Sequence, residues 1–548
     1  MNSGRFLLAV ILMIAVVVVT NVIFPPAPRA PRPPADTARP RAAPAPAPSP
    51  AQPAAGIPGV PEPELVPADT ILVRSPFYEY RIVSRGGSLV GARLLRYQVQ
   101  PPRGGAVVEL APPALPGLFS YRLRIGTREI DLARLPFSAS ASGLVVLDSA
   151  SGPRTLTLQH TSDTVTATVA YTFHPTRYAI DVRMNVRTPT AETPSLAVQM
   201  PHTLAINEAV RQEDERALAY VVNSQEEGIS SARLRSIKAQ RLESGPLSWV
   251  AVKNKYFVAA ALMDPEVRRP FAALIAEPIG RPYAARMLAT GMLPGPDGNF
   301  AFRLYAGPLE PAQLEQLGYH FEDVNPFGWR LFRPVLQPLG HGIAWVLYGI
   351  HNTLGLGYGW VLILFGVLIR IVLWPLNAKA MRSQLKTMQL QPKVKELQAK
   401  FKNDPQRMQQ EMIRLYREEG FNPMGGCLPM LIPLPILITL FFVFQSTIAF
   451  RGVQFLWLPD LSRFDPYYIL PVLLGISMFL MQWLSARSTP DPNPQMKLMM
   501  YFMPIFMTFI FLRFASGLNL YYTAMNVASI PQQLQIVRER KRLQTARR

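Results

Sequence analysis

Five apolar runs follow one another between residues 357 and 536, and a sixth lies near the N-terminus. A helix that crosses a bilayer needs about 20 consecutive apolar residues, because the hydrocarbon core is about 30 Å thick. The runs come close to that length, so they predict a multi-pass α-helical membrane protein with six spans. We place the spans at residues 6–24, 357–376, 428–446, 467–486, 498–514 and 517–536.

One cation interrupts the first of the five C-terminal runs. Arg370 lies inside the apolar sequence from Trp360 to Trp374, where a charge costs roughly 2.5–3.5 kcal/mol and normally faces protein or water. No Asp or Glu lies inside these five runs to pair with it. Arg370 therefore either extends to the headgroups near Asn377, about 10 Å further along a helix, or faces a wet cavity that admits an anion.

The N-terminal region predicts an anchor followed by a tether. The run from Phe6 to Phe24 follows a short basic start and is longer than the roughly 7–15 residues of a signal-peptide core. We therefore interpret residues 1–24 as an uncleaved signal anchor; the other interpretation is a cleaved signal peptide. Residues 25–69 are rich in Pro and Ala and cannot bury a core, so they predict an extended linker.

Residues 70–326 alternate between apolar and polar side chains. The segment from Tyr178 to Val186 places every second, apolar residue on one face, which is the period of a half-buried strand. Val165–Phe173 and Trp249–Met263 are also typical of strands. Turn residues separate such runs at short intervals, so we expect a large β-sandwich. Its role is either that of a passive scaffold or that of a binding domain with a cleft.

Residues 327–356 mix aromatic, cationic and apolar positions. This mixture predicts one or two amphipathic helices that lie at a membrane interface.

The distribution of Lys and Arg predicts the orientation in a membrane. The loop 377–426 carries ten of them and the tail 537–548 carries six, whereas the loop 447–466 carries two. By the positive-inside rule, the first two segments and both termini lie in the cytoplasm, and the β domain lies outside it. The net charge of +20 is explained in the same way, so we expect no DNA partner.

The loop 377–426 combines this charge with apolar residues at helical spacing. Asn403-Asp404-Pro405 divides it, which predicts an amphipathic helical hairpin on the cytoplasmic face. Its apolar faces either pack on each other or offer an adaptable surface to varied apolar segments. The methionines that would make such contacts are Met381, Met388, Met408 and Met412.

The sequence gives little support to redox, metal or hydrolytic chemistry. Cys427 is the only cysteine, so no intrachain disulfide can form, and the six histidines show no metal-ligand spacing. The spans contain no Ser/His or paired-Asp arrangement, which disfavours an intramembrane hydrolase. We expect no cofactor and no metal.

A series of short motifs runs through residues 330–536. After the span of Arg370 these are Trp374-Pro375-Leu376, Leu390-Gln-Pro-Lys393, Asn422-Pro-Met-Gly-Gly-Cys-Leu-Pro429, Asp465-Pro-Tyr-Tyr-Ile-Leu-Pro471, Phe502-Met-Pro504 and Ser516-Gly-Leu-Asn-Leu-Tyr-Tyr522. As an ordered set they resemble the YidC/Oxa1/Alb3 family of membrane protein insertases, and most closely its six-span Gram-negative members. The β domain is similar in position and size to the periplasmic domain of that family.

The resemblance implies a five-span core at 357–536 with a hydrophilic groove in the inner leaflet. Arg370 would supply the positive charge of the groove, and Tyr521, Tyr522 and Asn526 would lie beside it on the last span. The hairpin would form a flexible cytoplasmic entry, and the β domain would be a periplasmic supersandwich. The implied location is the bacterial inner membrane.

The expected function is therefore that of a membrane protein insertase and chaperone, not that of an enzyme. The implied partners are nascent membrane proteins, the lipid bilayer, the Sec translocon and the ribosome. The alternative is a secondary transporter of an anionic solute. The missing intramembrane carboxylates and the lack of an evident internal repeat weaken that alternative.

Overall fold

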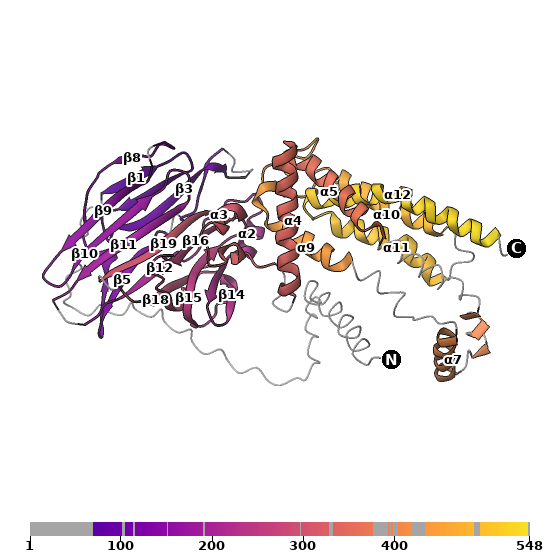
Figure 1. Cartoon of the computed structure of the whole chain (residues 1–548), viewed down its shortest axis with the longest axis horizontal. Coiled ribbons are helices and arrows are strands. Elements are labelled where there is room, and N and C mark those ends of the chain that lie inside the picture. The colour runs from indigo at the N-terminus through magenta and orange to yellow at the C-terminus, as the bar shows by residue number, and fades with distance from the viewer. Residues whose placement is uncertain are drawn as a thin grey trace, which may run out of the picture. The chain divides into compact units, whose positions relative to one another are not determined.

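The computed structural model divides the chain into two compact units, 1–65 and 66–548, and the described residues all belong to the second (Figure 1). They are 69–100, 105–112, 115–150, 152–189, 192–295, 298–327, 332–375, 393–394, 396–397, 400–401, 404–418, 433–486 and 494–545. The predicted anchor at 1–24 and the linker before Asp69 lie outside them, as do Met381, Met388 and Cys427.

The N-terminal part of the described chain is built on a sheet of fourteen strands. All strand pairs in this sheet are antiparallel, with β13 and β14 extending it beside β15. In sheet order the strands are β6 (Arg128–Asp131), β5 (Ser120–Ile125), β12 (Ser195–Met200), β18 (Ala285–Met292), β17 (Phe271–Pro278), β15 (Arg241–Lys253), β16 (Phe257–Met263), β19 (Asn299–Pro308), β11 (Ala179–Arg187), β10 (Thr166–Phe173), β9 (Arg154–Thr161) and β7 (Ser138–Ala139), with β13 (Ala219–Ser224) and β14 (Gly228–Arg233) off this path.

A second sheet of five strands packs on the first through buried tyrosines. The hydroxyl of Tyr80 donates to the main-chain oxygens of Tyr178 and Ala306. Both oxygens lie 2.9 Å away, at the larger sheet. Side chains of both sheets share one buried core. The predicted β-sandwich is therefore confirmed. In order, the strands of the second sheet are β4 (Val107–Glu109), β3 (Ser88–Gln98), β2 (Tyr78–Val83), β1 (Thr70–Arg74) and β8 (Leu144–Val146).

The predicted strands are confirmed where apolar and polar residues alternate regularly. One predicted strand is wrong, because a turn divides it. β11 buries every second residue from Ile180 onward, as the pattern around Tyr178–Val186 predicts. The run Trp249–Met263 is not one strand, because it divides into the end of β15 and all of β16. Asn254 makes the turn between them, since its side-chain oxygen accepts hydrogen bonds from the backbone N–H groups of Tyr256 and Phe257.

The C-terminal part of the described chain is helical. Its longer helices are α4 (Arg333–Leu354), α5 (Tyr358–Val372), α7 (Pro405–Glu418), α9 (Pro433–Ser446), α10 (Ile469–Ala486), α11 (Pro494–Phe511) and α12 (Ser516–Thr545). Short helices also follow or join strands and helices: η1 (Leu132–Arg134), α2 (Arg211–Ala217), η2 (Leu234–Ser236), α3 (Pro311–Glu315), η3 (Phe321–Val324) and η4 (Ile448–Phe450). The amphipathic segment predicted at 327–356 contains one long helix, α4, which continues through Pro338.

Within the described ranges, no helix combines the length and the apolar character that crossing a membrane requires. The six predicted spans are therefore not confirmed by the structure.

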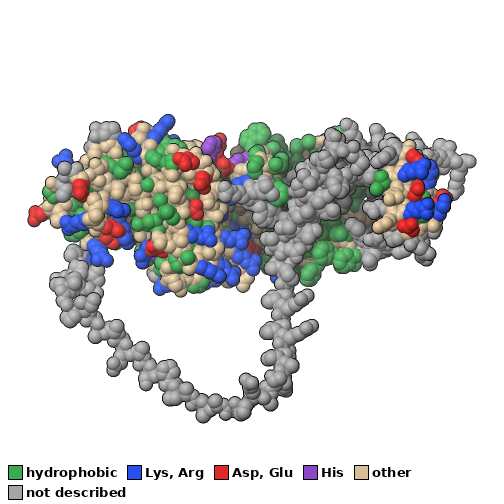
Figure 2. All heavy atoms as spheres, turned by 90° about the horizontal axis from the view of Figure 1, so that it is seen from below, with side chains coloured by type: hydrophobic (Ala, Val, Ile, Leu, Met, Phe, Trp, Pro, Cys, Tyr) green, Lys and Arg blue, Asp and Glu red, His purple; other side chains and the backbone are tan. Residues whose placement is uncertain are grey.

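Large hydrophobic side chains are nevertheless exposed on the helices, whereas charged side chains are spread over the β domain (Figure 2). Trp345 on α4 is 78% exposed, and Phe509 on α11 is 73% exposed. Exposed apolar surface of this kind marks a contact with a partner or a lipid phase.

A buried ion pair joins the two parts. Arg451, just after η4, donates to Glu208 of the β domain over 2.7 Å, and their side chains are 3% and 9% exposed. The guanidinium also lies over the rings of Tyr256 and Phe257. Burial raises the pKa of the Glu208 carboxyl, and Arg451 opposes that rise. Three residues earlier, Ile448 is buried within the core of the β domain.

The ion pairs of Asp181 give the β domain a measurable acid sensitivity. Asp181 on β11 accepts hydrogen bonds from His174 and, across the strand pair, from Arg303, both over 2.7 Å. Partial burial raises the pKa of Asp181, but these two partners outweigh it and lower the pKa from 3.8 to about 2. The carboxylate therefore stabilises the fold above about pH 4, and this contribution is lost as the pH falls towards 2.

We expect Asp181→Asn to unfold at a lower temperature than the unchanged chain at pH 7, because it loses this stabilisation. The difference should shrink between about pH 4 and pH 2. Circular dichroism melts of the full chain across this range measure it, and Asp163→Asn, at an exposed position, is the matched control. A difference that stays constant from pH 4 to pH 2 would contradict the assignment.

Candidate functional site

The helices α5 and α12 run parallel and in close contact. A Cβ atom on Gly517, at the start of α12, would lie 3.1 Å from the side chain of Leu362 on α5. One turn further along α5, a Cβ atom on Gly366 would lie 3.0 Å from the main-chain oxygen of Tyr521. Beyond the end of α5, Gln532 donates to the main-chain oxygen of Trp374 over 3.3 Å. The partners advance in the same direction on both helices, which defines the parallel register.

Arg370 lies four residues after Gly366 and therefore on the same face of α5. Its side chain is half-buried, and its Nε atom is buried without a hydrogen-bond partner among the described residues. Arg370 also belongs to the last turn of α5, where a cation offsets the partial negative charge of the free carbonyl groups. The helix end thus explains part of the position, but it leaves the Nε–H group without a partner.

Other buried polar atoms near this helix pair also lack partners within the described part of the chain. They are the Asn519 side-chain oxygen, the Tyr522 hydroxyl and the Gln532 side-chain oxygen, all on α12. A buried polar group without a hydrogen bond costs about 1–3 kcal/mol. Native proteins usually satisfy such groups with water or a bound molecule. The chemistry of this region is therefore suited to water or to polar groups of a guest.

The structure places the predicted groove residues on different faces of α12. Tyr521 is 1% exposed and packs on Phe365 and Phe444, so it belongs to the apolar core. Asn526 faces α10 instead, where it donates to the Ser477 hydroxyl over 3.0 Å. Tyr522 is also buried. The proximity of all four residues to one groove stays a prediction.

Sequence reasoning missed two residues that the structure brings into this region, Gly366 and Gln532. The position of Gly366 could have indicated its role from the sequence. It lies one helical turn from a buried cation, where a glycine permits close contact with another helix. Gln532 follows Pro531, and α12 continues through that proline. Nothing in its spacing pointed to Trp374.

The predicted cytoplasmic hairpin is described only in part. α7 carries Met408 and Met412 one turn apart, and both side chains are half-buried. Asp404 precedes the helix and accepts a hydrogen bond from the backbone N–H of Arg407. Met381 and Met388 lie outside the described residues, so the methionine surface stays a prediction. In the described ranges, no three His, Cys, Asp or Glu side chains gather into a metal site.

Two family models match most of the described chain. The YidC periplasmic domain model matches residues 70–339, and the 60Kd inner membrane protein model matches residues 349–543. The first spans all the strands of both sheets, and the second covers the helices from the end of α4 to α12. The chain belongs to the YidC family of membrane proteins.

Curated relatives carry the name membrane protein insertase YidC. That of Aromatoleum aromaticum is 37% identical over 305 residues, which are 55% of this chain and 53% of the relative. That of Burkholderia multivorans is 35% identical over 312 residues, which are 57% of this chain and 55% of the relative. The chain thus spans about half the length of the curated relatives it matches.

A crystal structure of an active YidC insertase with its first transmembrane domain resolved is also similar. It covers 85% of this chain and 95% of its own, at 16% identity and a TM-score of 0.35.

A larger residue at Gly366 should separate α5 from α12. We expect Gly366→Leu to destabilise the protein by about 1–3 kcal/mol, because the new side chain meets the backbone of α12. Thermal melts of the full chain in detergent measure the loss. Gly349→Leu, on an exposed position of α4 where a Cβ atom meets nothing within 4 Å, is the matched control. Equal melting temperatures for the two variants would refute the proposed helix contact.

Proposed function

We propose that this chain is a membrane protein insertase and chaperone that moves nascent membrane proteins from the cytoplasm into the bilayer. The observation that carries the proposal is the match of residues 349–543 to an inner membrane protein family whose curated relatives are named insertases. The Arg370 Nε–H, which has no partner among the described residues, and the buried polar atoms of α12 support it, because a hydrophilic groove requires polar groups at such depth.

In this proposal the helices α5, α9, α10, α11 and α12 lie in the bacterial inner membrane. The β domain is periplasmic, and both termini are cytoplasmic. The match of residues 70–339 to a periplasmic domain and the Lys/Arg-rich loop at 377–426 support this orientation. The exposed hydrophobic side chains on these helices would then face lipid.

The mechanism follows from the cost of moving polar chain through lipid. A wet groove shortens the apolar path that the polar flanks of a nascent segment must cross. Arg370 attracts acidic groups in those flanks and offsets their charge during the passage. The apolar segment then leaves along the groove wall into lipid, driven by about 25 cal/mol for each Å² removed from water. This activity includes no covalent step, so the protein is not an enzyme.

The partners in this proposal are nascent membrane proteins, the lipid bilayer, the Sec translocon and the ribosome. The methionines at 408 and 412 would receive apolar segments on the cytoplasmic side, since flexible thioether side chains adapt to varied shapes. Tyr522 and Asn526 would line the groove beside Arg370. Tyr521 would support the wall, because it is buried against Phe365 and Phe444.

The second candidate function is a secondary transporter of an anionic solute. Arg370 alone favours it, because a half-buried cation attracts an anion. The absence of Asp and Glu from the sequences of the C-terminal runs weighs against it, since ion coupling usually needs buried carboxylates. Anion flux into vesicles that contain the purified chain separates the two functions.

The charge of Arg370 provides the test of the proposed function. Cells depleted of their own insertase would carry the unchanged chain, Arg370→Lys, Arg370→Ala or Arg370→Glu, and insertion of a short, acidic-tailed membrane protein would be measured. We expect the unchanged chain and Arg370→Lys to support insertion. Arg370→Ala should reduce insertion about tenfold or more, and Arg370→Glu should abolish it. Arg513→Ala, at an exposed position after α11, is the matched control and should insert normally.

Two outcomes would count against this proposal. If Arg370→Ala inserts the substrate as well as the unchanged chain, a groove charge is not required. If the unchanged chain fails although immunoblots show it in the membrane at normal levels, the insertase function itself is wrong.

A further inference from the structure

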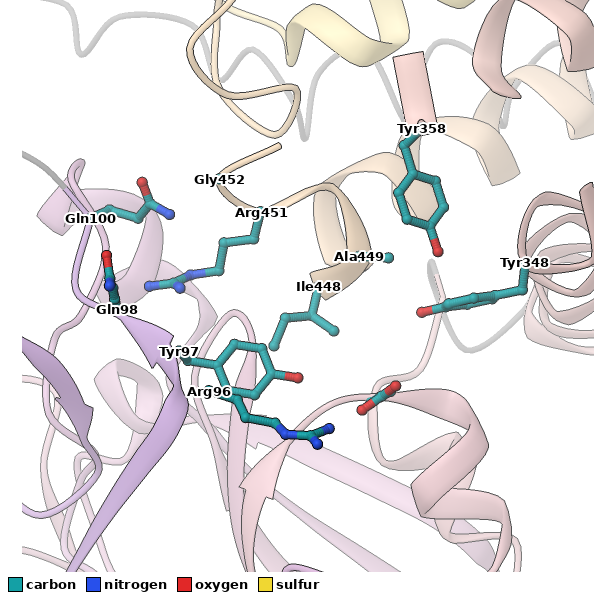
Figure 3. A pocket seen from close by; sticks show the side chains of 11 residues that line it. Arg96, Tyr97, Gln98, Gln100, Tyr348, Tyr358, Ile448, Ala449, Arg451 and Gly452 are labelled. Atoms are coloured by element: carbon teal, nitrogen blue, oxygen red, sulfur yellow. The ribbon is translucent and has the colours of Figure 1, made fainter. Parts of the chain in front are cut away.

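A pocket of about 480 Å³ opens where the β domain meets the helices (Figure 3). β3 and the segment after it supply Arg96, Tyr97, Gln98 and Gln100, and the loop before α3 supplies Glu310. The other lining residues are Tyr348, Tyr358, Ile448, Ala449, Arg451 and Gly452. The groove around Arg370 and the predicted mechanism make no use of this pocket.

The pocket is lined by charged side chains of both signs. Arg451 is already neutralised by its buried ion pair with Glu208. Arg96 forms no ion pair within the described residues, and its guanidinium lies 3.5 Å from the ring centre of Phe77. Glu310 accepts a hydrogen bond from the amide of Gln313 but forms no ion pair there either. Among the described residues, the pocket therefore offers one cation and one carboxylate that form no ion pair.

The pocket also contains a polar group without a partner. The hydroxyl of Tyr348 is buried and makes no hydrogen bond among the described residues. Figure 3 shows this hydroxyl and that of Tyr358 pointing into the space above Arg96. The ring of Tyr348 meets that of Tyr358 edge-on, with centroids 6.3 Å apart. Burial raises the pKa of the Glu310 carboxyl, so an arriving cation would relieve the cost of its charged form.

Two exposed tryptophans indicate the level of the pocket relative to a membrane. Trp345 lies on α4 three residues before Tyr348, and Trp360 lies on α5 two residues after Tyr358. They are 78% and 55% exposed. Tryptophans concentrate at the headgroup level of a bilayer. If α5 lies in the membrane as proposed above, its first turn and the pocket lie at the periplasmic headgroups.

We propose that this pocket binds the headgroup of a zwitterionic phospholipid, a phosphoethanolamine ester, with Arg96 at the phosphate and Glu310 at the ammonium. The hydroxyls of Tyr348 and Tyr358 donate to phosphate oxygens. The acyl chains leave past Trp345 and Trp360. This assignment rests on the membrane location in the proposed function, but not on insertase activity.

Binding to the purified full chain in detergent provides the test. The probes are short-chain phosphatidylethanolamine, short-chain phosphatidylglycerol and free phosphoethanolamine, measured by calorimetry. We expect the ethanolamine lipid to bind more tightly than the other two. Arg96→Gln and Glu310→Gln should each weaken that binding about tenfold or more, because each loses a charged contact. Glu310→Gln should also remove the preference over phosphatidylglycerol.

The matched control is Arg128→Gln, at an exposed position on β6. It should bind like the unchanged chain, and thermal melts must show that all variants fold. Equal binding of both lipids by the unchanged chain would overturn the proposal, as would variants that bind normally. If free phosphoethanolamine binds as tightly as the lipid, the occupant is not a membrane lipid. An active insertase that binds no lipid here would refute this inference and leave the proposed function intact.

Discussion

The buried ion pair between Arg451 and Glu208 is the interaction on which the arrangement of the described chain depends. Both side chains are almost fully removed from solvent, and they come from segments more than 240 residues apart. A charge left alone in such a place costs several kcal/mol, so the two segments separate only at a high price in free energy. Ile448 adds an apolar contact beside the pair, since it is buried in the β-domain core. The pocket next to Arg451 exists because these contacts hold both of its walls.

The candidate groove depends on a different constraint, the close approach of α5 and α12. Glycines at 366 and 517 remove the side chains that would keep the helices apart. Arg370 shares the face of α5 that makes this contact, and α12 carries several buried polar atoms without partners among the described residues. Buried polar groups without hydrogen-bond partners lower the stability of the fold. Proteins keep such groups mainly at functional sites. The family assignment and the Arg370 Nε–H, which lacks a partner among the described residues, thus direct attention to the same helices.

The sequence predicted the β-sandwich because alternation with a period of two is a local signal. β11 and β10 follow that signal closely, whereas Asn254 interrupts a run whose hydrophobicity hides the turn. Arg370 could be selected because a charge in an apolar run is conspicuous. The Arg451–Glu208 pair could not be predicted, since nothing local connects two residues so distant in sequence. The six predicted spans rested on apolar length alone, and the structure does not confirm them.

The glycine contact also decides which parts of the core can move. At Gly366 the backbone of α5 faces the backbone of α12 with no flexible side chain between them. This main-chain contact sets the spacing of the two helices at that point. In the proposed insertase, a guest segment would therefore not pass between α5 and α12 at Gly366. Arg370 lies one turn beyond this contact, so in the proposed mechanism its charge would be carried by a helix whose position α12 helps to set.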